Sequence, residues 1–276
     1  MDPVPRLSSQ RPGTSPPGFG SESLGWLDGP DRGAAGSAPR PHRVAVLQSN
    51  YLPWRGTFDL IARVDTFVIY DVVQYTKNDW RNRNRVKGPG GLQWLTIPVA
   101  RERLGQTIAE TQVADPRWAR KHWRTLEQCY RRAPSFEAVA EVLAPAYREL
   151  ADEPSLSTIN ESFLRLICGL LGIPTRIVRA EGASLPDGRN ERLLAVLKRL
   201  GATHYLSGPS ARSYLDEPAF EEAGVRVEWM RYPDYPAYPQ LHGAFEPAVS
   251  VVDLLFHMGG EARRYLEPAA GPGAVG

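Results

Sequence analysis

After residue 42 the chain alternates between short apolar runs and longer stretches with apolar residues at helical spacing. Arg43–Gln48 is a short apolar run that predicts a strand, and Thr66–Tyr70 predicts a second one. Between them, Arg55–Arg63 has the spacing of a helix. Because two strands joined through a helix in so short a segment form a βαβ unit, we expect these strands to be parallel.

A β-hairpin is predicted next, because the turn Gly88-Pro89-Gly90-Gly91 separates a polar, aromatic stretch at Asp71–Val86 from a strand at Leu92–Pro98. Three helices follow, at Asp115–Arg131, Ser135–Ala151 and Ser157–Gly172. Further strands are predicted at Thr175–Arg179, His204–Leu206 and Val225–Met230, and further helices at Asn190–Gly201 and Val249–His257. This order predicts an α/β fold, a three-layer (Rossmann-like) sandwich with a mostly parallel sheet and an inserted β-hairpin and helical segment.

The ends of the chain differ in composition from its centre. Residues 1–41 are rich in Pro, Gly and Ser and poor in large apolar side chains, so they cannot bury enough surface to offset their ordering entropy. We expect a disordered tail there, or an upstream extension from a misassigned start. Residues 42–268 are expected to form a single α/β domain, and residues 269–276 a disordered C-terminus.

The charge balance and the absence of familiar motifs exclude several functions. With 33 basic and 31 acidic residues the net charge is only +2, which gives no reason to expect nucleic acid or a membrane surface as partner. The two cysteines, Cys129 and Cys168, are expected to be free thiols. Phosphate-loop, dinucleotide and metal-ligand spacings are absent, so no metal is expected. Without a secretory signal or a spanning apolar run, we expect a cytoplasmic protein.

Polar side chains follow the first two predicted strands. Gln48, Asn50, Tyr51 and Trp54 follow the first, at the strand end where parallel sheets bind ligands, and the next helix N-terminus favours an anion. They are candidate substrate-binding residues; alternatively, the two aromatic rings plug a loop and the amides bond to backbone. Asp71 and Gln74 follow the second strand, where Asp71 is a candidate base or metal ligand; alternatively, it caps a helix or makes a structural hydrogen bond.

The twelve residues Thr76–Lys87 contain five cations, three asparagines and one tryptophan. Arg81, Arg83 and Arg85 share one parity, so an extended chain places them on one face, which could grip phosphate or carboxylate. A solvated charged face and a nucleic-acid surface are the alternatives. The segment supplies Lys77 as a candidate catalytic residue, and Trp80, Arg81, Asn82, Arg83, Asn84 and Lys87 as candidate substrate-binding residues.

Two later segments add further candidates. A Ser/Gly/Pro turn after the strand at His204–Leu206 could bind an anion through its backbone, or be a plain turn with a helix cap at Ser210. A Tyr/Pro-rich loop at residues 232–247 could close over a substrate or pack as a surface loop. The turn supplies Tyr205, Ser207, Ser210 and Tyr214 as substrate-binding candidates, and the loop region supplies Tyr235 and Gln240 for binding and Asp253 for catalysis.

Five ordered motifs resemble the WbqC-like family. They are Q-x-N-Y-L-P-W, D-x-V-Q-Y, W-x-N-R-N-x-x-K followed by W-L-T-x-P-V, Y-L-S-G-P-S-x-x-x-Y-L, and F-x-P-x-x-S-x-x-D-L-L-F. The similarity spans about Val44 to Leu266. The sequence departs from the commoner opening H-Q-P-N, because Leu47 replaces the histidine and Ser49 the proline. A histidine base at that position is therefore not available to this chain.

The resemblance implies a function in polysaccharide (including O-antigen) or natural-product biosynthesis, with acyl or aminoacyl transfer to an amino sugar or related small amine. Gln48, Asn50 and Tyr51 would orient the amine, and Asp71, Lys77 or Asp253 would act as base. The expected substrates are a small amine or a nucleotide sugar; no cofactor is expected to be tightly bound, and a phosphopantetheine thioester on an acyl or peptidyl carrier protein is a possible co-substrate. The alternatives are a non-catalytic binding or scaffold protein and a nucleotidyltransferase-like enzyme.

Overall fold

The computed structural model describes residues 40–182 and 185–267. The chain divides into two units, Met1–Arg40 and Pro41–Gly276, and the helices and strands of the described residues belong to the second. The disorder predicted for residues 1–41 and 269–276 concerns residues that, apart from 40 and 41, lie outside the described ones.

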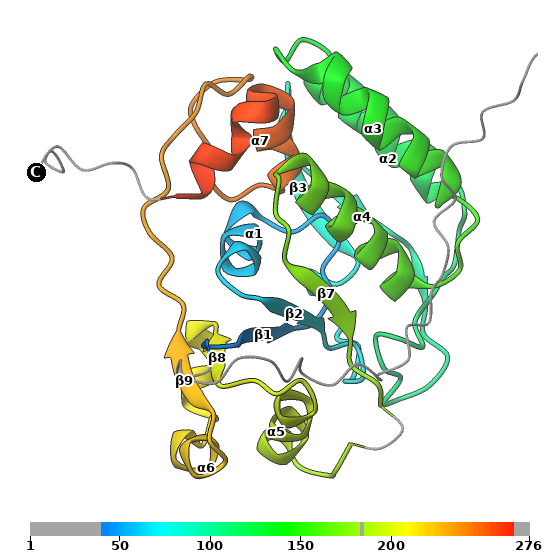
Figure 1. Cartoon of the computed structure of the whole chain (residues 1–276). Coiled ribbons are helices and arrows are strands. Elements are labelled where there is room, and N and C mark those ends of the chain that lie inside the picture. The colour runs from blue at the N-terminus through cyan, green and yellow to red at the C-terminus, as the bar shows by residue number, and fades with distance from the viewer. Residues whose placement is uncertain (1–39, 183–184, 268–276) are drawn as a thin grey trace, which may run out of the picture. The chain divides into compact units, whose positions relative to one another are not determined.

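A five-stranded parallel sheet forms the centre of the second unit (Figure 1). Its strands are β1 (Arg43–Leu47), β2 (Thr66–Ile69), β7 (Arg176–Arg179), β8 (His204–Ser207) and β9 (Arg226–Trp229), in the order β7-β2-β1-β8-β9. Neighbouring strands pair in parallel throughout, and α1 (Arg55–Ala62) connects β1 to its neighbour β2. The predicted βαβ unit and the predicted α/β fold class are confirmed.

Helices cover both faces of this sheet, because successive side chains of a strand point to opposite faces. On one face, Val44 and Val46 belong to a cluster with the apolar residues of α5 (Arg189–Arg199) and α6 (Glu217–Glu222). On the other, Ala45 belongs to the larger cluster that includes α1 (Arg55–Ala62). Figure 1 shows α5 and α6 below the sheet and the labelled helices of the other face above it. The result is a three-layer arrangement.

The segment between β2 and β7 carries a hairpin and a helical layer. Strands β3 (Arg83–Gly88) and β4 (Gly91–Thr96) pair antiparallel around the predicted turn. A second small pair, β5 (Val99–Ala100) with β6 (Gln112–Val113), was not predicted, because two-residue strands leave no period to detect. The helices of this layer are α2 (Trp118–Tyr130), α3 (Phe136–Glu149) and α4 (Leu156–Leu170).

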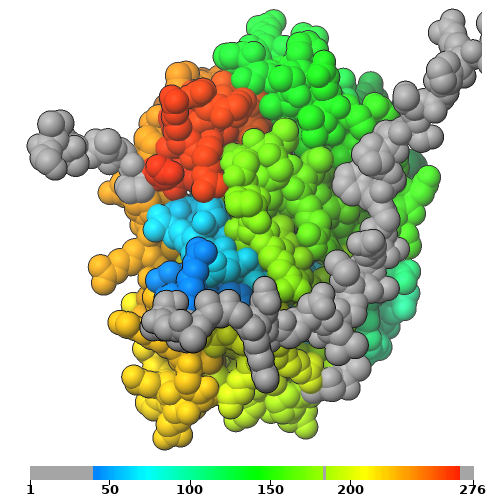
Figure 2. Space-filling model, viewed as in Figure 1, coloured from blue at the N-terminus to red at the C-terminus, as the bar shows by residue number. Residues whose placement is uncertain are grey.

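The C-terminal helices pack onto the same layer. Helix α7 (Val251–Met258) begins after Ser250, whose hydroxyl accepts a hydrogen bond from the Val252 amide, and continues into η2 (Gly259–Leu266). Figure 2 shows this red segment against α1 and α4 on one face. Helix α7 sits beside β3, which brings the segment before it next to the hairpin.

The prediction of a helix capped by Ser210 is wrong. A short 3-10 helix, η1 (Pro209–Ser213), begins after Gly208 and has no side-chain cap. The next α-helix is α6, which is capped by the side chain of Asp216 accepting from the Ala219 amide. Proline at the first position of η1 presets the turn without a hydroxyl cap.

The order of the strands reverses between β1 and β8. From β1 the chain proceeds to β2 and β7 on one side, and later to β8 and β9 on the other. At such a reversal the loops leaving the two central strands diverge, and ligands bind there in open parallel sheets. Gln48–Asn50 follows β1 and Gly208 follows β8 at this edge. Within the described part of the chain, no helix has the length and apolarity needed to cross a membrane.

Candidate functional site

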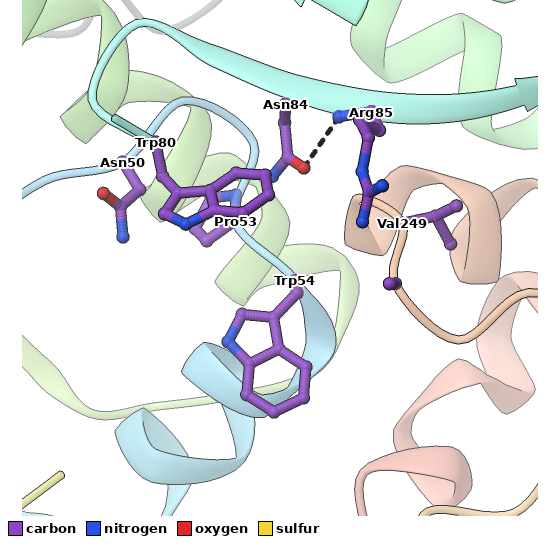
Figure 3. Close-up of a pocket in the computed structure, with 8 residues that line it drawn as sticks. Asn50, Pro53, Trp54, Trp80, Asn84, Arg85 and Val249 are labelled. Atoms are coloured by element: carbon purple, nitrogen blue, oxygen red, sulfur yellow. Dashed lines mark hydrogen bonds between the residues drawn. The ribbon is translucent and has the colours of Figure 1, made fainter. Parts of the chain in front are cut away.

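A pocket of about 310 Å³ opens beside the carboxyl end of β1 (Figure 3). Its walls come from the loop between β1 and α1, the start of the hairpin, and the segment before α7. This volume is at the lower end of the roughly 300–1,000 Å³ typical of small-molecule sites. The lining residues are Asn50, Pro53, Trp54, Trp80, Asn84, Arg85, Ala248 and Val249.

Two tryptophans form aromatic walls of the pocket, each supported by further rings. Trp54 is 39% exposed, and its ring centroid lies 5.1 Å from that of Tyr232 and 6.0 Å from that of Tyr235. Trp80 is 43% exposed and lies 5.7 Å from Trp94. Because both indoles line the same pocket, they offer flat faces there for a ring or sugar.

The position of Trp54 depends on Gly56 in the first turn of α1. The Trp54 indole packs directly on the Gly56 backbone, so that a Cβ atom at residue 56 would overlap Cζ2 and Cη2 of the ring. The Gly56→Ala substitution is therefore expected to displace the indole and reshape the pocket. Because the ring end is half-exposed and can swing aside, the free energy of unfolding should change by less than about 1 kcal/mol.

Fluorine NMR of 5-fluorotryptophan-labelled protein can test this expectation. In Gly56→Ala the resonance assigned to Trp54 should shift, while that of Trp118, buried in the core, should stay in place. Gly90, whose added Cβ would meet nothing within 4 Å, provides the matched control Gly90→Ala. An unchanged Trp54 resonance in Gly56→Ala would contradict the packing described.

Arg85 brings an uncompensated cation to the pocket. Its guanidinium carbon lies 6.0 Å from the ring centroid of Trp80 and 5.7 Å from that of Trp94. Its Nε atom is buried without a hydrogen-bond partner, and within the described residues no side-chain hydrogen bond or ion pair engages the group. A guanidinium left with free donors in a concave aromatic site favours a carboxylate or phosphate.

The two other arginines of the same parity are held in different ways. Arg81 donates to the side-chain oxygens of Gln48 and Asn50 and lies 3.4 Å from an oxygen of Asp79. Burial lowers the pKa of Arg81, and Asp79 opposes that effect. Arg83 donates to the carbonyl of Asn78 and stacks 4.4 Å from the ring of Trp94. Gln48, Asn50 and Arg81 thus form one cluster, and its Asn50 member lines the pocket.

Asp71 lies beneath this cluster but does not face the pocket. It is 4% exposed; one carboxylate oxygen accepts from the Ser49 amide at 2.7 Å, and the other accepts from the Ser157 hydroxyl. Both oxygens therefore position the loop that carries Gln48 and Asn50. The prediction of Asp71 as a base in an open crevice does not fit this geometry, because no described path exposes the carboxylate to a substrate amine.

Asp253, Lys87 and Gln240 form a separate buried network. The Asp253 carboxylate accepts from the hydroxyls of Tyr130 and Tyr238 and from Gln240 Nε2, at 2.7–2.8 Å. Burial would raise the pKa of Asp253, but hydrogen bonds from His257, Gln240 and Tyr238 hold it below its ordinary value. The Lys87 ammonium donates to Gln240 Oε1 and to loop carbonyls. These contacts fix the 232–247 loop, which corrects the prediction of Asp253 as a catalytic residue and of Lys87 and Gln240 as substrate-binding residues.

Three other candidates are core residues. Tyr51 is fully buried, with its hydroxyl bonded to His122 and Tyr147. Asn82 donates to the Ile97 carbonyl, and Asn84 donates to the Leu52 carbonyl, so both amides hold the hairpin to its neighbours. The loop-plugging alternative for Tyr51 matches this geometry, and Asn84 also lines the pocket.

The remaining candidates lie away from the pocket lining. Tyr205 is buried and accepts from the Ser207 hydroxyl, while Ser210 is exposed. Tyr214 is 44% exposed and lies under Arg189. Gln74 and Lys77 are exposed, and Gln74 forms a bridge with Thr107. Tyr235 supports Trp54 from behind and donates its hydroxyl to Asp59 at 2.7 Å.

The remaining chemical groups of interest among the described residues are possible metal ligands and thiols. Across residues 40–182 and 185–267, no group of three or more His, Cys, Asp or Glu side chains is placed to hold a metal ion. Burial raises the pKa of Cys129 to about 11 and that of Cys168 to about 12. Both are buried free thiols, which is the environment of inert cysteines.

Sequence reasoning placed Arg85 on one face with Arg81 and Arg83 but did not name it as a substrate-binding residue, and it missed Trp94. Arg85 shares the parity of Arg81 and Arg83, so the alternation already placed it on the same face. Its pairing with Trp94 depends on the hairpin register, in which Arg85 lies opposite Trp94. The predicted turn at Gly88–Gly91 determines this register, so counting outward from the turn along both strands would have paired Arg85 with Trp94.

Comparison with known proteins gives two matches. The model of the family described as "WbqC-like protein family" matches residues 48–265. The uncharacterised protein Rv1507c of Mycobacterium tuberculosis is 52% identical over 225 residues, which cover 81% of this chain and 97% of that protein. No solved structure matches the chain significantly.

Proposed function

Because the chain belongs to the WbqC-like protein family, we propose that its aromatic pocket binds a phosphate-bearing small molecule for acyl or aminoacyl transfer to an amine. The observation that supports this proposal is the Arg85 guanidinium, which lines the pocket beside Trp80 without an anionic partner. A phosphate on the substrate would supply that partner through bidentate hydrogen bonds.

The proposed reaction joins an acyl thioester to the amine of an amino sugar or related compound, in polysaccharide (including O-antigen) or natural-product biosynthesis. The amine nitrogen forms a bond to the thioester carbonyl carbon, the carbon–sulfur bond breaks, and the departing thiolate takes the proton lost by the amine. Either the phosphopantetheine arm of a carrier protein or a nucleotide sugar would bring the phosphate. Because the thiolate can accept the proton, this scheme does not require the buried Asp71 as base.

The contribution of the protein would be positioning. Holding two reactants in line contributes on the order of 7–11 kcal/mol in favourable cases. Asn50 would orient the amine through its amide, since its oxygen is already fixed by Arg81. Trp54, supported by Tyr232 and Tyr235, would exclude water from one side, so that transfer competes with hydrolysis.

Mass spectrometry of the full chain with carrier-bound acyl groups and candidate amines tests the proposal. We expect an amide product, and Arg85→Met should lower its rate of formation roughly 10- to 100-fold, the value of a charge-assisted contact. Arg124→Met, on the exposed side of α2, is the matched control and should leave the rate unchanged. If no amine yields a product although ligands bind, the transferase is disproved.

A second candidate function, non-catalytic binding within a biosynthetic assembly, is favoured by the composition of the pocket. Its lining residues include no acid, histidine or thiol. A binding protein needs the pocket but no transfer. Stoichiometric ligand binding in calorimetry, with every donor thioester recovered intact after incubation with amines, would identify this function.

A further inference from the structure

The binding surface continues beyond the pocket along the exposed face of the β3–β4 hairpin. Arg83 and Arg85 are two residues apart on β3 and therefore project from the same face. On β4, Trp94 lies opposite Arg85 and is 48% exposed. Trp80 connects this face to the pocket, since it lines the pocket and also contacts Trp94.

The two neighbouring cations on this face, Arg83 and Arg85, form no ion pair within the described residues. The Nε atoms of both are buried without partners. The nearby Asp79 forms its ion pair with Arg81, at 3.4 Å, and interacts with Arg83 only at longer range, where that cation helps to lower the pKa of Asp79. Residues two apart on a strand are separated by about 7 Å along it, so their long side chains can converge on two adjacent phosphates. A single phosphate or carboxylate would occupy only one of them.

The aromatic walls of the pocket favour a ligand that contains a flat ring. Trp54 and Trp80 line the same cavity, and each packs against another aromatic side chain. Indoles that line a cavity are platforms for flat rings, because nucleobases stack on them irrespective of sequence. A phosphopantetheine arm has no ring and would leave these faces unused.

From these two features we infer that the ligand is a nucleoside diphosphate conjugate. Its base stacks in the pocket against Trp54 and Trp80, and its two phosphates bind Arg85 and Arg83. The inference rests on the proposed function, because it names the substrate class of the same pocket. It selects the nucleotide-linked substrate over the carrier-bound arm as the molecule that fills the pocket.

Isothermal titration of the full chain with uridine, adenosine, guanosine and cytidine diphosphates provides the test. At least one of them should bind ten times more tightly than its monophosphate, than pyrophosphate and than 4′-phosphopantetheine. Arg83→Met should weaken the diphosphate at least fivefold and the monophosphate less than twofold, because only the second phosphate contacts Arg83. Arg85→Met should weaken both at least tenfold.

Trp80→Leu tests the ring separately. It should weaken nucleoside diphosphate binding at least fivefold and leave pyrophosphate binding unchanged. Trp229→Leu on β9 and Arg124→Met on α2 are the matched controls and should leave nucleotide binding unchanged. Circular dichroism melts of each variant establish that it is folded; if Trp80→Leu is not, Trp80→Phe, which keeps a smaller ring, should weaken binding by an intermediate factor.

The possible outcomes separate this inference from the proposed function. If 4′-phosphopantetheine binds and nucleotides do not, the inference is overturned and the transferase proposal stands. If no phosphate compound binds, both are overturned. Tighter binding of an eight-residue oligothymidylate than of any nucleoside diphosphate would also overturn the inference, because it would identify a single-stranded nucleic acid as the ligand of this surface.

Discussion

Asp253→Ala is expected to lower the free energy of unfolding by about 3–5 kcal/mol. The substitution removes the shared acceptor of Tyr130, Tyr238 and Gln240. The two tyrosine hydroxyls would then be buried without an acceptor, and Gln240 Nε2 would keep only the Glu246 carbonyl. His257, whose Nδ1 lies 3.4 Å from the carboxylate, loses its neighbour as well. The residue is completely buried, so water cannot replace the lost oxygens.

Urea unfolding followed by circular dichroism measures this change. Asp234→Ala is the matched control, because Asp234 is an exposed acidic residue of the same loop region, and it should change stability by less than about 0.5 kcal/mol. Asp253→Asn should lie between them, since it keeps one acceptor oxygen. Equal midpoints for Asp253→Ala and Asp234→Ala would show that the network does not stabilise the fold.

The second large effect is a loss of stability in acid, caused by His122. Its Nε2 bonds to the Thr96 carbonyl and must carry the proton, so Nδ1 accepts from the Tyr51 hydroxyl in the neutral ring. Burial lowers the pKa of His122 to about 4, from an ordinary value of 6.5. A protonated ring would lose the Tyr51 hydrogen bond and be charged inside the core.

Because the pKa of His122 is lower in the folded protein than in the unfolded chain, acid lowers the free energy of unfolding. As the pH falls from about 6.5 to about 4, the unfolded chain binds a proton at His122 and the folded chain does not. The stability that the neutral ring confers is complete above pH 6.5 and is lost through this interval, by roughly 3 kcal/mol at its lower end.

His122→Gln tests the assignment, because a glutamine amide can accept from Tyr51 and donate to Thr96 without titrating. Thermal melts of the variant between pH 7 and pH 4 should lose much less stability than those of the wild type. The same acid dependence in both proteins would rule out His122 as its source. The variant should also be less stable at pH 7, because an amide fits the aromatic surroundings of the ring less closely.

The two networks have a common consequence for the site. Asp253 and Lys87 anchor the loop of residues 232–247 to α7 and β3, and that loop carries the tyrosines that brace Trp54. The His122 network anchors Tyr51, next to the pocket-lining segment Pro53–Trp54. The charged groups that sequence reasoning assigned to chemistry therefore act mainly on the scaffold of the pocket.

Local periodicity alone was enough to predict most of the fold. Strand β1 has apolar residues at both even and odd positions: Val44 and Val46 point to one face of the sheet and Ala45 to the other. This pattern is typical of a strand that is covered on both faces. The glycine-rich turn Gly88–Gly91 fixed the hairpin, and helical spacing located α2 to α5. These features depend on neighbours within a few positions in the chain, so the sequence contains them directly.

The functional assignments of individual side chains were decided only by tertiary structure. Arg81, Arg83 and Arg85 are equivalent in the sequence, yet Gln48 and Asn50 engage the first, while the last stays unpaired beside two indoles. Asp71 follows a strand and Asp253 lies at the start of a helix, which are common places for catalytic acids. However, Ser157 and Tyr130, from distant segments of the chain, donate hydrogen bonds to these carboxylates. Whether a charged group is free to bind a ligand depends on such long-range partners, and a one-dimensional pattern does not contain their distances.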